Sequence, residues 1–228
     1  MLNSAFAARS FGILDHMVTR APGLRERKKL HTRQALSWAA VRLAVERGLE
    51  NVLVDDIAAA AGVSARTFNN YFSSKAEAIA ARHLDRSRRA VAEFRARPRE
   101  EALWTAISHA VLSQYAGDPS GSTPDWVAGV RLMISEPALR GEFLRAETLA
   151  EEEFAEVVGE RTGTDPGWDL YPRLVAAAVG AAGRVAIHRW LSVNPPGLLE
   201  PLLSNALDQI AAGLPDPSAS SAAPPRTD

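Results

Sequence analysis

The sequence predicts an all-α fold, on three observations. Alanine and leucine dominate the chain, and apolar residues recur at three- and four-residue spacing almost throughout it, as in amphipathic helices. Alternation of apolar and polar residues, the signature of strands, is scarce. With 228 residues, the chain is long enough for a small helical module and a larger helical domain, so we expect about nine helices.

The first expected helix covers residues 24–47. Its stripe of Leu36, Ala40 and Leu43 faces inward, and Gly48 stands just beyond its end, where glycine commonly terminates a helix. Its first turns, with the sequence RERKKLHTR, are strongly basic. We therefore expect an amphipathic helix whose beginning carries positive charge.

Two short helices about a tight glycine turn are expected next, in the arrangement of a helix-turn-helix. The first covers residues 54–61 and stops at Gly62, and the second begins after Ser64, whose hydroxyl is positioned to cap the amides of the next turn. Phe68 and Phe72 are four residues apart, so both face one side and anchor the second helix. Its polar face is then available to a partner.

Capping residues and helix-breaking residues predict the remaining helices. Ser74 and Glu77 form a capping box that opens a long helix, which we expect to end before Pro98. Further helices are expected over residues 100–115, 125–135, 138–161, 168–192 and 198–212. We expect four parts: a flexible extension (1–22), a helix-turn-helix domain (23–75), a ligand-binding and dimerisation domain (76–213) and a disordered tail (214–228).

Composition narrows the possible functions. The chain has no cysteine, which excludes disulfides, thiolate metal sites and cysteine nucleophiles and fits a reducing cytosol. Residues 1–92 hold 15 Lys and Arg against 8 Asp and Glu, whereas the rest of the chain holds 11 against 19. This asymmetry predicts a basic module that meets a polyanion, attached to an acidic body. A chance partition of solvated charge is the alternative.

No membrane segment or export signal is expected. The most apolar segment, residues 174–191, is interrupted by Arg184, His188 and Arg189 and falls short of the roughly 20 apolar residues of a membrane helix. The N-terminus lacks the basic start, long apolar run and cleavage site of a secretory signal, so we expect a cytoplasmic location. Met17 is an alternative start of the chain.

The segment VDDIAAAAGVSARTFNNYFSSKAEAI, preceded by TRQALSWAAVRLAVERG, resembles the DNA-binding domain of TetR-family regulators over about residues 26–80. The resemblance rests on Asp-Ile-Ala ahead of Ala-Gly-Val-Ser, on the Thr-Phe and Tyr-Phe pairs, and on the Ser-Lys that starts the next helix. It implies a homodimer that binds a pseudo-palindromic operator in double-stranded DNA and a small-molecule effector. Repression is expected over activation because most family members repress.

The resemblance also implies a helical C-terminal domain whose last two long helices form a four-helix bundle with the second subunit. Gly180 and Gly183 would let a partner helix approach closely, although both helices could instead be ordinary intramolecular core. The stretch RLMISEPALRGEFLRAETLAEEEFAEVVGERTG resembles the domains of a subgroup thought to bind long-chain acyl-CoA or similar lipidic ligands. An apolar or acyl-type effector is therefore expected.

DNA reading is expected from the exposed face of the second short helix. A helix in the major groove reads base edges with short or planar hydrogen-bonding side chains, which Arg66, Asn69 and Asn70 supply. The resemblance makes Lys75 a phosphate contact, since it adds its charge to a helix N-terminus. With the basic residues nearby, the expected DNA contacts are Lys28, Lys29, Thr32, Arg33, Ser64, Arg66, Thr67, Asn69, Asn70, Tyr71 and Lys75. Any single basic residue could instead be a solvated surface group.

Two positions depart from the family pattern. Leu53 stands where the family usually has a Thr or Ser that caps the helix over residues 54–61 and contacts phosphate, so we expect that cap and contact to be missing. Asn69 stands where an aromatic residue is common, which puts a backbone contact in doubt and enlarges the base-reading surface. Neither position belongs to the apolar anchor, so we expect the fold to be unaffected.

An effector pocket is expected among the later helices, where aromatic and soft side chains occur beside a few polar ones. Tyr115, Trp168 and Tyr171 are further aromatic candidates, and His109 is a further polar one. Core packing explains most of these side chains equally well. The expected ligand-binding residues are Trp104, Ser108, Trp126, Arg131, Met133 and Phe143.

Two other functions compete with this interpretation. An enzyme is disfavoured because the five histidines are scattered, no metal-ligand, P-loop, dinucleotide or nucleophile-elbow motif occurs, and Glu151 to Glu153 cannot converge on one point of a helix. We expect no cofactor and no metal. A ligand-binding scaffold that has lost DNA binding is suggested by Leu53 and Asn69, but Arg66, Tyr71 and Lys75 argue against it.

Overall fold

The computed structural model describes residues 23–115, 123–193 and 196–216. These residues form an all-α structure, which confirms the predicted fold class. The helices are α1 (Leu24–Arg47), the 3-10 helix η1 (Leu49–Asn51), α2 (Val54–Ala60), α3 (Ala65–Asn69), α4 (Lys75–Ala96), α5 (Leu103–Leu112), α6 (Pro124–Ser135), α7 (Pro137–Thr162), α8 (Leu170–Leu191) and α9 (Glu200–Ala211). The expected extension (1–22) lies outside the described residues, as does the expected tail after residue 216.

Most helix bounds agree with the sequence to within two residues, and α1 agrees at both ends. Helix α5 is shorter than the expected 100–115. Before it, Arg161 of α7 donates hydrogen bonds to the carbonyls of Pro98 and Glu101 and holds the chain in a turn. After it, the amide of Tyr115 bonds to the carbonyl three residues earlier, so the last turn is tighter than an α-helix. The 3-10 helix η1 was not expected.

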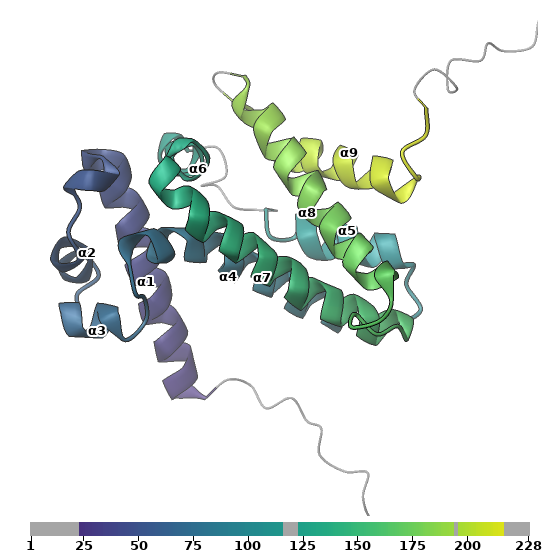
Figure 1. Cartoon of the computed structure of the whole chain (residues 1–228), viewed down its shortest axis with the longest axis horizontal. Coiled ribbons are helices and arrows are strands. Elements are labelled where there is room, and N and C mark those ends of the chain that lie inside the picture. Colours follow the sequence, from purple (N-terminus) through teal and green to yellow (C-terminus); the bar gives the residue numbers. More distant parts are fainter. Residues whose placement is uncertain (1–22, 116–122, 194–195, 217–228) are drawn as a thin grey trace, which may run out of the picture.

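The first core lies at one end of the molecule, where α1, α2 and α3 gather (Figure 1). Leu36, Ala40 and Leu43 of α1 are buried in it, as the stripe predicted. Ile57 of α2 and Phe68 of α3 complete it, and both are fully buried. The helix-turn-helix is therefore packed directly on α1.

Helix α4 joins this core to the rest of the molecule. Ala78 and Ile79 near its start are buried in the first core, whereas Val91 and Phe94 near its end are buried in a second core with residues of α5, α7 and α8. There the ring of Phe94 stacks on that of Phe154 with centroids 5.6 Å apart. One helix thus contributes side chains to both cores.

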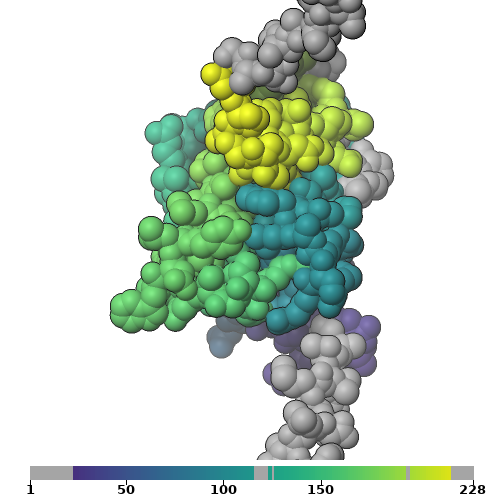
Figure 2. All heavy atoms as spheres, turned by 90° about the vertical axis from the view of Figure 1, so that its right-hand side faces the viewer, coloured from purple at the N-terminus to yellow at the C-terminus, as the bar shows by residue number. Residues whose placement is uncertain are grey.

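A third core joins α6, α8 and α9. It is centred on Trp126 and Trp190, whose rings meet edge to face at 4.8 Å. The indole N–H of Trp190 donates to the carbonyl of Gly197 at 2.7 Å and so fixes the chain ahead of α9. Figure 2 shows α9 directly above α5 on the right-hand face of Figure 1.

Helix α8 leaves apolar side chains uncovered in the single chain. Leu170, Leu174 and Val185 are 75%, 63% and 65% exposed. By length and composition alone, α8 is long and apolar enough to cross a membrane, which the sequence analysis of residues 174–191 did not predict, and 28% of its most apolar window is buried in the single chain. The helix therefore presents a surface that the described residues do not cover.

Candidate nucleic-acid interface and internal cavity

Helix α3 is held in place by its apolar side and its N-terminal cap. Phe68 and Phe72 are 0% and 1% exposed, with ring centroids 5.7 Å apart, which confirms the predicted anchor. The Ser64 hydroxyl accepts a 3.2 Å hydrogen bond from the amide of Thr67, as the sequence predicted. A helix of five residues is too short to be stable alone, so this burial and capping fix its direction.

The opposite side of α3 is open. Arg66, Asn69 and Asn70 are all exposed, and they are the residues predicted to read base edges. Thr67 is turned back, with its hydroxyl 3.0 Å from that of Ser64. Tyr71 is partly buried against the first core. The structure thus brings three planar hydrogen-bonding side chains to one short exposed segment.

The turn before α3 depends on Gly62. Its φ is +71°, a left-handed conformation that side-chain-bearing residues rarely adopt, and its amide bonds to the carbonyl of Ala59 at 3.0 Å. Helix α2 begins without a side-chain cap from Leu53, which confirms the expected loss. The Asp56 carboxylate instead accepts a 3.1 Å hydrogen bond from the amide of Leu53. One of the backbone amides at the start of α2 therefore still has a hydrogen-bond acceptor.

The basic start of α1 is exposed to solvent. Lys28 and Lys29 lie on its first turns, and both are exposed. Thr32 turns its hydroxyl to the carbonyl of Lys28 at 3.0 Å, so the hydroxyl is used within the helix. These two lysines are therefore free to approach a phosphate backbone.

Two of the predicted phosphate contacts are bound to the protein itself. The ammonium of Lys75 donates to the carbonyls of Leu49 and Val52 at 2.6 and 2.9 Å, which satisfies the end of η1. The guanidinium of Arg33 forms a 3.4 Å ion pair with Asp85 and lies 4.6 Å from the ring centroid of Phe72. For either cation to contact phosphate, some of these interactions must be shared or broken.

Sequence reasoning missed a buried link between α1 and α4. Ser37 is 1% exposed, and its hydroxyl donates a 2.6 Å hydrogen bond to the carbonyl of Ala78. The available signal was a serine inside the apolar stripe of α1, beside Leu36 and Ala40. This bond fastens the two helices that support α3.

A cavity of about 370 Å³ lies in the helical body, bounded by residues from α4 to α9. Its size is within the range of small-molecule sites, and its walls are mainly apolar. A second cavity of about 40 Å³ adjoins it and shares several wall residues. The shared residues are His83, Arg86, Tyr115, Met133, Ile134, Phe143 and Ile187.

Half of the predicted ligand-binding residues lie elsewhere. Met133 and Phe143 line the larger cavity, and Trp126 lines the smaller one. The other three line neither cavity, because side-chain direction depends on how each helix is rotated in the bundle: these are Trp104, Ser108 and Arg131.

Each of these three has a different environment. Trp104 packs against the second core, two helical turns before Val111, the α5 residue that reaches the cavity. Ser108 is only partly buried on α5, and Arg131 is exposed on α6, about 200° around that helix from Met133. The further candidate Trp168 is 89% exposed, whereas Tyr115 lines both cavities.

The charged residues of the cavity were missed as well. On α4, His83 and Arg86 share a helical stripe with the buried Ile79 and Ala90, so polar groups interrupt an inward-facing side. That interruption was the available signal. Four further charged residues reach the cavity from α7 and α8: Arg140, Glu147, Glu151 and Arg184.

Of these charged residues, Arg184 forms ion pairs with both glutamates. The guanidinium of Arg184 lies 3.5 Å from the Glu147 carboxylate and 3.2 Å from that of Glu151. Burial raises the pKa of Glu147, and the charge of Arg184 partly opposes that rise. Burial, followed by the charges of Arg86 and Arg184, lowers the pKa of His83 to about 4. His83 is therefore neutral near pH 7.

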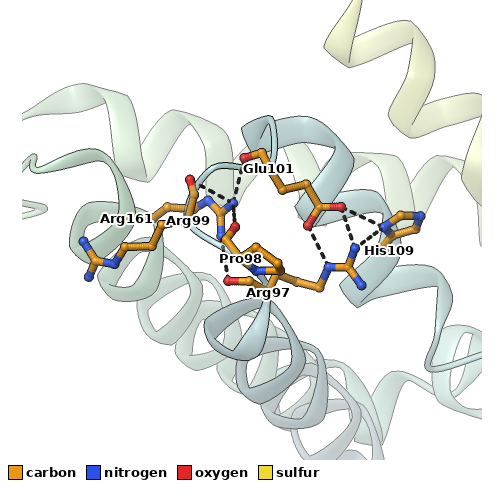
Figure 3. A network of polar contacts seen from close by, with 6 residues as sticks. All are labelled: Arg97, Pro98, Arg99, Glu101, His109 and Arg161. Carbon is orange, nitrogen blue, oxygen red and sulfur yellow. Dashed lines mark hydrogen bonds and ion pairs between the residues drawn. The ribbon is translucent and has the colours of Figure 1, made fainter.

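A separate polar network lies at the C-terminal end of α4 (Figure 3). Glu101 accepts from the guanidinium of Arg97 at 2.6 and 2.7 Å and lies 3.0 Å from the ring of His109. Arg97, with a smaller contribution from His109, lowers the pKa of Glu101 to about 2. Together with the Arg161 bonds to the same turn, this network fixes how α4 leads into α5.

Comparisons with known proteins place these features in a family. Residues 38–81 match the family model of bacterial regulatory proteins of the tetR family, and residues 101–215 match that of the MftR C-terminal domain. The chain is 33% identical over 174 residues to the HTH-type transcriptional regulator TcmR of Streptomyces glaucescens, covering 74% of this chain and 77% of TcmR. It is 29% identical over 192 residues to the regulator MftR of Mycobacterium tuberculosis, covering 82% and 93%.

Solved structures share the fold. A TetR-family regulator from Syntrophomonas wolfei is similar with a TM-score of 0.58 and 16% identity, covering 82% of this chain and 98% of that one. The fatty acid degradation regulator FadR from Bacillus halodurans is similar with a TM-score of 0.54 and 19% identity, covering 80% and 96%. The arrangement of nine described α-helices is therefore one that several solved regulators adopt.

Proposed function

The chain belongs to the TetR family of bacterial regulatory proteins, and on that premise we propose that it represses transcription by binding a pseudo-palindromic operator as a homodimer until a small effector releases it. Membership makes it a DNA-binding transcriptional regulator and not an enzyme. The proposal is carried by the exposed polar face of α3, held on the buried pair Phe68 and Phe72. Its place of action is the cytoplasm, where the operator lies.

Helix α3 presents the chemistry of major-groove reading. The Arg66 guanidinium suits the two acceptors of guanine, and the amide of Asn69 or Asn70 suits the donor and acceptor of adenine. Lys28 and Lys29 at the exposed start of α1 supply charge for the phosphate backbone, which positions a protein on DNA without reading sequence. Base reading and backbone positioning thus come from separate helices.

The uncovered face of α8 supports the homodimer. Its exposed Leu170, Leu174 and Val185 would be buried by a second copy, with α9 beside them. Gly183 does not belong to this face, because it lies about 200° around α8 from Val185 and lines the larger cavity, which is the open space that an added Cβ would enter. Gly180 has another role, because its Cβ would lie 2.6 Å from the Glu151 carboxylate of the same chain. Two half-sites about 34 to 36 Å apart require such a pairing.

Helix α4 supports coupling between the cavity and α3. The cavity contacts α4 at residues 83–90, and the preceding turns of α4 hold α1 and η1 through Ser37 and Lys75. We propose that an apolar or acyl-type effector displaces α4 and thereby the two α3 helices of the dimer. A shift of one helix end by about 1 to 2 Å at an interface is typical of such switches.

Selection of random duplex DNA by the purified protein at near-physiological salt tests the proposal. Enrichment of a pseudo-palindrome bound by two or four chains is the expected result. A variant with Arg66→Ala, Asn69→Ala and Asn70→Ala should enrich nothing, while Thr148→Ala on the exposed side of α7, away from the proposed subunit interface, should enrich the same site. Only weak, salt-sensitive binding by the wild type would favour a ligand-binding scaffold without an operator.

A further inference from the structure

Arg86 is a cation that lines the cavity and forms no ion pair with any residue that the structure describes. It lines both the larger and the smaller cavity, and its Nε is buried with no hydrogen-bond partner among the described residues. The acidic side chains of the cavity do not form ion pairs with Arg86, because Glu147 and Glu151 pair with Arg184. The positive charge of Arg86 is therefore left uncompensated by these two carboxylates.

Aromatic rings contact Arg86 without accepting its hydrogen bonds. The guanidinium carbon lies 4.7 Å from the ring centroid of Tyr115 and 5.7 Å from that of Trp126. Such contacts favour a cation electrostatically, but they leave the in-plane N–H groups to other acceptors. An acceptor that satisfies Arg86 must therefore lie in the plane of the guanidinium, as a carboxylate does in a bidentate pair.

The neighbouring His83 adds no charge to the cavity near pH 7. His83 is neutral at pH 7, and its ring is tilted against that of Phe143, with the ring centroids 5.0 Å apart. The buried Nε–H of Arg86 has no acceptor among the residues that the structure describes, so an anion that accepts its hydrogen bond recovers desolvation free energy that the protein has already lost. Apolar side chains such as Val179 and Ile187 line much of the remaining wall.

We propose that the cavity binds an amphipathic organic acid, with an apolar body against its walls and one anionic oxygen group on Arg86. This inference rests on the effector role proposed for the cavity and specifies the chemistry of that effector. Arg86 is then the residue that selects an acid over a neutral molecule of the same shape. Because Arg86 lies on α4, the contact acts on the helix that supports α3.

A matched pair of fluorescent probes tests this choice. Anilinonaphthalene sulfonate and N-phenyl-1-naphthylamine share an aromatic body, but only the first carries an anionic group. Titrated into full-length protein without DNA, Arg86→Met should weaken sulfonate binding by about tenfold or more, as expected for a lost charge-assisted pair. Binding of the neutral probe should change less than about threefold.

Two controls make the result specific. Arg95→Met makes the same change on α4 at an exposed arginine that pairs with Glu160 outside the cavity, and it should alter neither probe. Val179→Trp fills the cavity and should abolish binding of both. Arg86→Lys keeps a charge without the planar donor pattern and should retain part of the preference for the sulfonate.

Three outcomes would overturn the inference: sulfonate binding that Arg86→Met leaves unchanged, an equal loss of both probes in that variant, or sulfonate binding that survives Val179→Trp. The first two deny a charge-selecting role to Arg86, and the third places the anion elsewhere. Since no DNA is present, these results are independent of operator binding. Failure here would leave the proposed regulator intact.

Discussion

The ammonium of Lys75 donates a 2.6 Å hydrogen bond to the carbonyl of Leu49, and this contact joins the start of α4 to the turn that precedes the helix-turn-helix. A second bond from the same ammonium, to Val52, is 2.9 Å long. Lys75 was predicted from the sequence as a phosphate contact. In the structure Lys75 also links α4 to η1, and a contact with DNA would be a second role.

Lys75→Ala should therefore have two effects. Loss of the phosphate contact should weaken binding to every DNA sequence and reduce the salt slope by about one. Loss of the two backbone bonds should also lower the free energy of unfolding, by about 1 to 2 kcal/mol. Binding to the enriched site and to scrambled DNA at several salt concentrations, together with urea unfolding, measures both. An unchanged salt slope would assign Lys75 to the fold alone.

Asn70→Ala should alter specificity instead of general affinity. Asn70 is exposed at the end of α3, so its removal should relax base preference at one position of each half-site and cost about 1 to 3 kcal/mol on the preferred sequence. The salt slope should not change. Repeating the DNA selection with this variant checks the prediction, and a uniform loss on all sequences would show that Asn70 contacts the backbone.

Gly129→Ala should disturb the contact between α6 and α1. An added Cβ would lie 2.9 Å from a methyl group of Val41, which is buried, so we expect a loss of about 1 to 3 kcal/mol in unfolding free energy. Gly141 is the matched control: it lies in α7 with open space around its Cβ position. Gly141→Ala should stabilise the protein by about 0.5 to 1 kcal/mol. Equal effects of the two variants in urea unfolding would contradict the close packing at Gly129.

Val185→Glu should dissociate the proposed homodimer. Val185 is 65% exposed on α8, so the substitution does not disturb a core of the single chain, but it places a charge in the proposed subunit interface. Sedimentation should give a dimer for the wild type and a monomer for the variant. Leu144→Glu introduces the same charge at a 55% exposed position on α7 and should leave the dimer intact. A dimeric Val185→Glu variant would move the interface away from this part of α8.

Acid should destabilise the protein through His83. Burial lowers its pKa from 6.5 to about 4 in the folded state, so between these pH values the unfolded chain binds more protons. Stability is therefore retained above pH 6.5 and lost as the pH falls toward 4, by up to about 3 kcal/mol from this group. His83→Gln should reduce that loss, as measured by urea unfolding at pH 7.5 and pH 5. The same pH dependence in the variant and the wild type would exclude His83 as its source.

The sequence alone was sufficient for the features that depend on near neighbours. The cap at Ser64, the glycine turn at Gly62 and the paired Phe68 and Phe72 are each set within a few residues, and the structure confirms all of them. Family resemblance identified the same segment because this local pattern is what the DNA-binding domain requires. The missing cap at Leu53 was predicted for the same reason.

Only the tertiary structure decided which partners the distant residues meet. Arg33 pairs with Asp85, 52 residues away, and Arg184 pairs with Glu147 and Glu151 on another helix. The cavity wall combines residues of six helices, so its composition depends on how each helix is rotated within the bundle, which is why Trp104 and Arg131 lie outside it and Arg86 lies inside. Helical periodicity gives the faces of each helix, but the packing of all helices together determines what each face meets.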